Sequence, residues 1–165
     1  MEGVHLHAHP DHTPGSRAPV IAVVAVGGAA GAALRYGVSH LWRNGSDAYL
    51  VWRTGAAAFP WTTLVVNVVG CFLMGVLTVA VKERFPHAPR LLNPLLGTGV
   101  LGGFTTFSSY TDDVRRLFEN DQPGAATGYL FLTVVGAMAG VVLGVVLARL
   151  ALTRGRPWPG RGQGL

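Results

Sequence analysis

The stretch Gly97–Tyr110, GTGVLGGFTTFSSY, lies inside one of four hydrophobic segments of the chain. It holds four glycines and five Ser or Thr hydroxyls, which is the wrong composition for a helix that only fills a bilayer. Within lipid, irregular backbone is tolerated only where it packs against protein or lines a polar cavity, because every N–H and C=O group needs a partner. We therefore expect the helix to break here and the break to form an interface, a pore, or both.

The composition predicts an integral membrane protein. Of the 165 residues, 50% are hydrophobic and 13% are charged, about half the charged fraction of a typical soluble domain. The net charge of +5 comes from arginines and a lysine that lie mostly in tails and connections, so nucleic acid is not an indicated partner. The single cysteine, Cys71, excludes an intramolecular disulfide.

Four membrane helices follow from the hydrophobic segments, so the fold class is all-α. The predicted spans cover residues 19–42, 61–81, 93–110 and 125–150. Residues 1–18 and 151–165 are polar, and we interpret both as disordered tails. The first tail carries His5, His7, His9 and His12, which suit a divalent metal, but a flexible cluster without cysteine or carboxylate support is a weak site.

Small residues form stripes on the predicted spans. Gly27 and Gly31 make a GxxxG pattern in the first span, and Gly136, Gly140 and Gly144 repeat every four residues in the last. Such faces let membrane helices approach closely. Because four narrow helices enclose little space, we expect an obligate dimer.

Polar residues inside the spans are the candidate functional groups. Asn67 and Thr63 share a face of the second span, and the amide is either interhelical glue or a donor on a polar path. Tyr129 and Thr133 give the fourth span a polar edge. Arg35 either reaches the headgroups or anchors the break. Phe107 and Tyr110 either pack normally or turn their electropositive ring edges toward an anion.

The distribution of basic residues favours both tails in the cytoplasm. One side holds Arg17, Lys82, Arg84, Arg90, Arg154, Arg156 and Arg161, and the other holds Arg43, Arg53, Arg115 and Arg116.

Together these features resemble the Fluc (CrcB) family of fluoride channels. The resemblance rests on GGAAGAALRY at 27–36, NVVG at 67–70, GGFTTFSSY at 102–110 and the Tyr129/Thr133 pair, and it covers about residues 20–150. It implies a plasma-membrane channel that conducts fluoride passively, excludes chloride, and lowers the fluoride content of the cytoplasm. It also implies an antiparallel, dual-topology dimer with two pores and a third helix that is broken mid-membrane.

The resemblance implies a role for individual residues as well. Backbone carbonyls of Gly102 and Thr105 from both subunits would hold a structural sodium ion at the dimer centre. Phe107 and Asn67 would line the pore, and Arg35 would match the family's first-helix arginine. The candidate hydroxyls along the path are Thr63, Ser108, Ser109 and Thr133.

Two features depart from the family pattern. Tyr110 stands where the family has a second pore phenylalanine, and its hydroxyl either donates to an anion or narrows the path. The charge asymmetry also exceeds what suits insertion in both orientations. We therefore hypothesise that this subunit inserts one way and pairs with an oppositely oriented homologous subunit, with a homodimer as the alternative.

Two other classes of function compete with a channel. A small four-helix antiporter for cationic or guanidinium-type compounds would share the length and glycine content, but it needs a carboxylate within the membrane. Glu83, Asp112 and Asp113 lie at the ends of the predicted spans. A non-transporting scaffold would use the histidine tail, and deletion of residues 1–18 would test it. The sequence contains no catalytic constellation, so we expect no enzyme.

Overall fold

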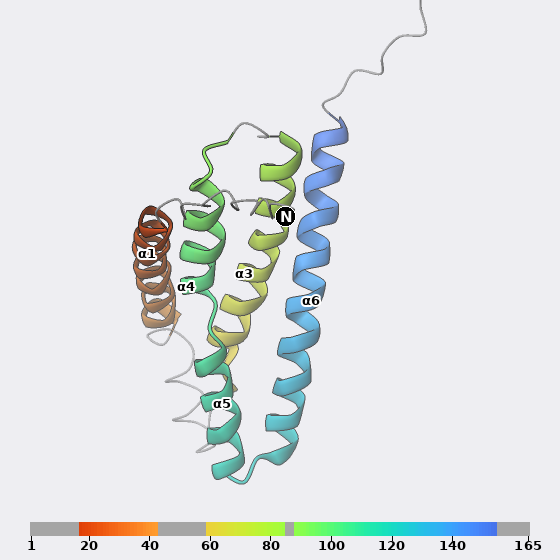
Figure 1. Ribbon diagram of the computed structural model, residues 1–165. Helices are drawn as coiled ribbons and strands as arrows, with labels where there is room; N and C mark the ends of the chain where they lie inside the picture. The colour runs from red at the N-terminus through yellow and green to blue at the C-terminus, as the bar shows by residue number, and fades with distance from the viewer. Residues whose placement is uncertain (1–16, 43–58, 85–87, 155–165) are drawn as a thin grey trace, which may run out of the picture.

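The computed structural model describes residues 17–42, 59–84 and 88–154 (Figure 1). The described residues form helices and short connections, with no β-strand among them. Most of the two predicted tails, including the four tail histidines, lies outside these ranges.

Four consecutive segments pack side by side and run alternately in opposite directions (Figure 1). Their elements are α1 (Ala18–Trp42), α3 (Trp61–Val79) with η2 (Ala80–Arg84), η3 (Pro94–Leu101) with α4 (Gly102–Phe104) and α5 (Phe107–Glu119), and α6 (Pro123–Arg154). Three of the described helices are long and apolar enough to cross a membrane, over Ala18–Leu41, Trp61–Glu83 and Pro123–Leu152. The remaining apolar segment is divided into η3, α4 and α5.

The division falls at Thr105 and Thr106, inside the glycine-rich and hydroxyl-rich stretch. α4 ends at Phe104, and the next two residues have extended backbone, with ψ of 155° at Thr105 and 124° at Thr106. η3 is a π-helix, a form that is common at functional sites. Two extended residues release nearby backbone groups from helical hydrogen bonding, so side chains from other helices must bind them.

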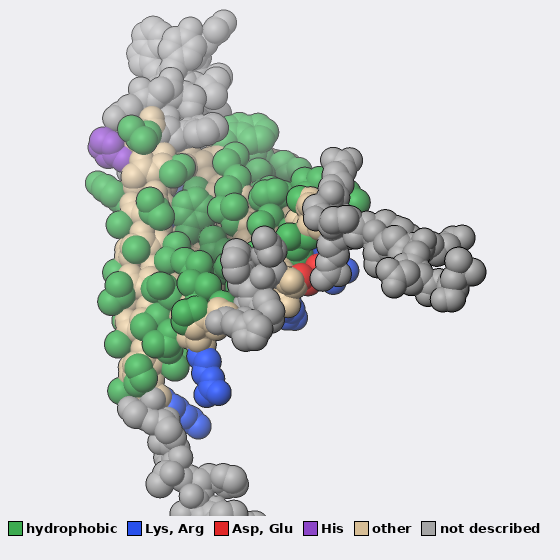
Figure 2. Space-filling model, turned by 90° about the horizontal axis from the view of Figure 1, so that it is seen from above, with side chains coloured by type: hydrophobic (Ala, Val, Ile, Leu, Met, Phe, Trp, Pro, Cys, Tyr) green, Lys and Arg blue, Asp and Glu red, His purple; other side chains and the backbone are tan. Residues whose placement is uncertain are grey.

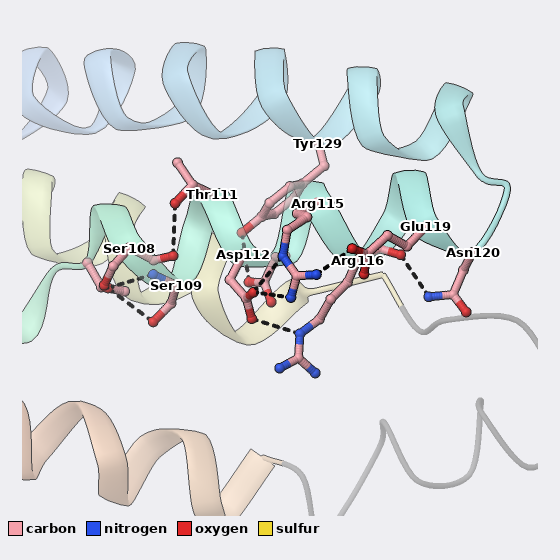
Figure 3. A network of polar contacts seen from close by, with 11 residues as sticks. Ser108, Ser109, Thr111, Asp112, Arg115, Arg116, Glu119, Asn120 and Tyr129 are labelled. Atoms are coloured by element: carbon pink, nitrogen blue, oxygen red, sulfur yellow. Dashed lines mark hydrogen bonds and ion pairs between the residues drawn. The ribbon is translucent and has the colours of Figure 1, made fainter.

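α5 continues nine residues beyond Tyr110, where the predicted third span ends. The charged residues stabilise the helix instead of ending it: Asp112 forms ion pairs with Arg115 and Arg116, at 2.7 Å each, and Arg115 pairs with Glu119 (Figure 3). These pairs have the i,i+3 and i,i+4 spacing at which helical neighbours meet. Leu117, which is buried, gives the same helix an apolar side against α6.

Glycines bring helix backbones together inside this chain. A Cβ atom built on Gly27 would lie 2.9 Å from Cα of Gly99, and one built on Gly140 would lie 2.8 Å from the Val68 carbonyl oxygen. Gly144 likewise abuts the backbone of Phe72 on α3. Both glycine stripes are therefore covered within one subunit, so they do not support the expected obligate dimer.

Large apolar side chains cover the outward faces of the bundle. Ile21 and Val26 of α1 and Phe131 and Met138 of α6 are among those with more than half of their surface exposed. In the view of Figure 2, hydrophobic side chains make up most of the described surface. Such a surface suits the lipid environment that the composition predicts.

Candidate functional site

Asn67 of α3 binds the backbone of the break with both ends of its amide. Its Oδ1 atom accepts from the Thr106 N–H at 2.8 Å, and its Nδ2 atom donates to the Thr106 carbonyl at 3.0 Å. The side chain is only 8% exposed, so this pair satisfies polar groups that burial would otherwise leave costly. Asn67 acts here as interhelical glue between α3 and the break.

Thr106 also caps α5. Its Oγ1 atom accepts from the Ser109 N–H at 3.1 Å and donates to Ser109 Oγ at 3.1 Å, while Ser108 Oγ lies 3.3 Å away. A Thr side chain that bonds to the third residue of a helix satisfies one of its free N–H groups. Thr106, Ser108 and Ser109 therefore form a compact hydroxyl cluster at the first turn of α5, and Figure 3 shows the two serines of this cluster.

Arg35 of α1 lies on the other side of the break. Its Nε atom donates to the carbonyl of Gly103 at 3.3 Å, which corresponds to the anchoring alternative of the sequence analysis. On the same segment, Thr105 Oγ1 donates back to the Leu101 carbonyl at 3.0 Å. The break is thus held by α1 before Thr105 and by α3 after it.

The two aromatic candidates differ sharply in exposure. The Phe107 side chain is 78% exposed, whereas Tyr110 is 8% exposed. Their ring centroids lie 5.7 Å apart. The Tyr110 hydroxyl donates to the Leu130 carbonyl of α6 at 3.2 Å, so its only hydrogen is already used within the protein.

A second polar group joins α3, α5 and α6 near the start of α5. Tyr129, which is fully buried, donates its hydroxyl to Asp113 Oδ2 at 3.3 Å. Thr63 of α3 lies near the same carboxyl group and lowers its pKa. Thr133, four residues after Tyr129, is 5% exposed, and its hydroxyl has no hydrogen-bond partner among the described residues. Hydroxyl groups of α3 and α6 thus lie around one half-buried carboxyl group of α5.

Two neighbouring carboxyl groups on α5 have opposite pKa shifts. Burial raises the pKa of Asp113 above its usual value, and the neighbouring hydroxyls of Thr63 and Tyr129 only partly offset that rise. Hydrogen bonds from Arg115 and Arg116 lower the pKa of the exposed Asp112. The side of α5 that faces the bundle therefore favours a neutral carboxyl group more than the outer side does.

The break carbonyls are the groups in this region that suit a metal ion. The described residues contain no cluster of three His, Cys, Asp or Glu side chains. Gly102 is exposed, and Thr105 has extended backbone, so the candidate ligands at the break are backbone carbonyl oxygens. Neutral oxygen ligands of this type fit a hard cation of low charge.

Most of these residues were predicted from the sequence as site residues, but Thr106 and Asp113 were not. Asn67, Ser108, Ser109, Phe107 and Arg35 all lie at or beside the break, while Thr63 and Thr133 lie nearer Asp113. Thr106 was not singled out, although a Thr three residues before a Ser at a helix start is a capping signal. Asp113 was placed at the end of a predicted span and not in a polar site, whereas Tyr129 was already part of the polar pair with Thr133.

Sequence comparison identifies a matching family and similar proteins. Residues 22–145 match the family model described as CrcB-like protein, Camphor Resistance (CrcB). The chain is 47% identical over 137 residues to fluoride-specific ion channel FluC 1 of Streptomyces coelicolor, covering 83% of this chain and 82% of that protein. It is 44% identical over 142 residues to fluoride-specific ion channel FluC 2 of Nocardia farcinica, covering 86% and 94% of the two chains.

The matched region begins in α1 and ends in α6, so it includes most of the bundle and every residue of the break. The chain belongs to the CrcB (Fluc) family.

Proposed function

We propose that this protein is a fluoride-specific channel that lets fluoride leave the cytoplasm passively, giving fluoride resistance without enzymatic activity. The break at Thr105 and Thr106 carries this proposal, because it places uncharged donors at the start of a helix within an apolar bundle. Family membership and the names of the relatives support the same function.

The chemistry of the site suits a small, strongly hydrated anion. A pore for fluoride must replace its water with donors, and amide, hydroxyl and aromatic ring edges do so without a fixed positive charge. A full positive charge would bind the ion too tightly to release it. Our proposed path comprises Asn67, Phe107, Thr63, Ser108, Ser109 and Thr133, with the ring of Tyr110 packed beside Phe107.

We also propose an antiparallel dimer with two pores, in which the break lies mid-membrane. The carbonyls of Gly102 and Thr105 from two subunits would hold a structural sodium ion, whose charge would stabilise carbonyl groups that face each other. The charge asymmetry between the two ends of the chain favours an oppositely oriented homologous subunit as the partner, and a homodimer is the alternative.

A proton-coupled exchanger is the second candidate, and one observation favours it. Asp113 lies half-buried against Tyr129 and not in a solvated connection, and burial raises its pKa. An exchanger needs such a carboxyl group. The two functions differ in one measurable property: channel flux follows the electrochemical gradient of fluoride alone, whereas exchange also requires a gradient of protons or of the exchanged cation.

The first experiment is anion efflux from liposomes that contain the purified protein, with fluoride and chloride electrodes read in parallel. We expect fast fluoride release, no chloride release, and no requirement for a pH gradient. Release that depends on a proton gradient would favour exchange. If neither anion is released, a homologous partner subunit should be co-expressed, and continued absence of flux would reject the channel.

Variants then test the path. We expect Asn67→Ala and Phe107→Ile each to reduce fluoride flux at least about tenfold while the dimer stays assembled. Phe118→Ile is the matched control, because Phe118 is an exposed phenylalanine near the other end of α5. Wild-type flux in both path variants would reject the proposed lining.

A further inference from the structure

Two tyrosines hold α5 against α6 by reaching in opposite directions. Tyr110 of α5 donates its hydroxyl to the Leu130 carbonyl of α6 at 3.2 Å. Tyr129 of α6 donates its hydroxyl to Asp113 Oδ2 of α5 at 3.3 Å, and its side chain reaches across to α5 in Figure 3. We call this arrangement of Tyr110, Asp113, Tyr129 and Leu130 the tyrosine clasp.

The rings of the clasp are locked by packing. The two ring centroids lie 5.5 Å apart, and Phe59 meets Tyr129 edge-on at 5.4 Å. Tyr110 and Tyr129 belong to one buried cluster with Leu117 and Ala126. Because both rings are buried, each hydroxyl is held where the other helix supplies its acceptor.

This geometry bears on what Tyr110 can offer an anion. A phenol hydroxyl has one hydrogen, and here that hydrogen is directed at a backbone carbonyl. The lone pairs that remain on its oxygen repel an anion. A direct donor role for the Tyr110 hydroxyl would therefore require the bond to Leu130 to break.

We propose that Tyr110 is a positioning residue whose hydroxyl fixes the first turn of α5 on α6 and does not bind the ion. Its ring contacts Phe107, and the same turn carries Ser108 and Ser109. The clasp thus sets the place of the exposed phenylalanine and the hydroxyl cluster relative to α6. The statement about fluoride rests on the proposed function, but the statement about the clasp does not.

A double-mutant cycle tests the proposal, with Tyr110→Phe, Tyr129→Phe and the combined variant. Tyr36→Phe is the matched control, because Tyr36 is a largely exposed tyrosine on α1. Hydrogen exchange of α5 amides and fluoride efflux at several fluoride concentrations are measured on each full-length protein in lipid.

We expect Tyr110→Phe to speed exchange of the α5 amides about fivefold, as expected for loss of one buried hydrogen bond. Efflux should slow, while the half-saturating fluoride concentration and the fluoride-to-chloride ratio stay unchanged. In the double variant, the exchange rate of the α5 amides should rise by less than the product of the two single-variant factors, because both hydroxyls hold the same pair of helices. Tyr36→Phe should match the wild type.

Two results would overturn the proposal. One is unchanged exchange of α5 in Tyr110→Phe with a raised half-saturating fluoride concentration, which would make the hydroxyl a direct donor. The other is a double variant whose exchange equals the product of the single effects, which would mean that the hydroxyls act independently. If the wild type releases no fluoride even with a co-expressed homologous subunit, the proposed function fails, and the exchange measurements still decide whether the clasp exists.

Discussion

The two halves of the divided segment pack in different ways. Before Thr105, η3 and α4 lie on α1 with backbone against backbone, since added Cβ atoms on Gly27 and Gly99 would each lie 2.9 Å from the other glycine's Cα. After Thr106, α5 lies on α6 through buried side chains and tyrosine hydroxyls. The first contact fixes distance, because no side chain intervenes, and the second fixes orientation, because hydrogen bonds are directional.

This contrast has a consequence for the break itself. Thr105 and Thr106 join a half held by α1 to a half held by α6, and Asn67 of α3 binds the junction from the side. The extended backbone is therefore maintained by three different neighbours. Loss of the contact with any one of these helices should destabilise the extended backbone of Thr105 and Thr106, while the other two contacts stay intact.

The largest effect is expected from a methyl group in the glycine contact. In Gly31→Ala, the new Cβ would lie 2.8 Å from the Phe104 amide nitrogen and 2.9 Å from the Val100 carbonyl carbon, neither of which can rotate away. We expect a loss of about 3 kcal/mol in unfolding free energy, the upper end for overpacking. Unfolding in mixed micelles of increasing SDS content would measure it.

Gly28→Ala is the matched control, because a Cβ on Gly28 would meet no atom within 4 Å. It should leave the unfolding free energy within about 0.5 kcal/mol of the wild type. Equal losses in the two variants would mean that helix propensity or lipid packing, and not the contact with η3 and α4, governs this face.

An intermediate effect is expected at the junction. Asn67→Ala removes both hydrogen bonds to the Thr106 backbone and leaves the Thr106 N–H without its acceptor. We therefore expect the unfolding free energy to fall by about 2 kcal/mol. Thr78→Ala serves as the control on the same helix, since its hydroxyl bonds only to the Met74 carbonyl four residues earlier. Its loss should stay under about 1 kcal/mol. A loss at Thr78 as large as that at Asn67 would contradict a special role for the junction.

Much of this organisation could be predicted from the sequence, because it depends on local composition. Apolar length predicts the helices, glycine spacing predicts the close contacts of Gly27 and Gly31, and the hydroxyl-rich stretch 97–110 marks where the helical path is interrupted. These signals need no knowledge of which helices are neighbours.

The partners of the polar groups could not be predicted in the same way. Asn67 bonds to Thr106 and Arg35 bonds to Gly103 across sequence separations of 39 and 68 residues, which no local pattern encodes. The glycine stripe of α6 was taken as a sign of dimerisation because sequence cannot tell an intramolecular face from an intermolecular one. α5 was cut short because Asp112 and Arg115 were taken as a helix end, although their spacing also suits ion pairs within a helix.

The smallest expected effect is a pH-dependent change in melting temperature, which should differ in sign between variants on the two faces of α5. For Asp112, whose pKa is lowered in the fold, the stabilisation is complete above the usual aspartate pKa of 3.8 and is lost as pH falls through the lower folded value. For Asp113, whose pKa is raised, a penalty for ionisation develops as pH rises from 3.8 through the folded value and remains at neutral pH.

We therefore expect Asp112→Asn to lower the melting temperature at pH 7 and Asp113→Asn to raise it, with both differences shrinking toward pH 3. Melting curves in detergent between pH 3 and pH 8 would measure this, and shifts of the same sign at pH 7 would mean that the bundle-facing and outer sides of α5 do not differ in polarity as the structure indicates.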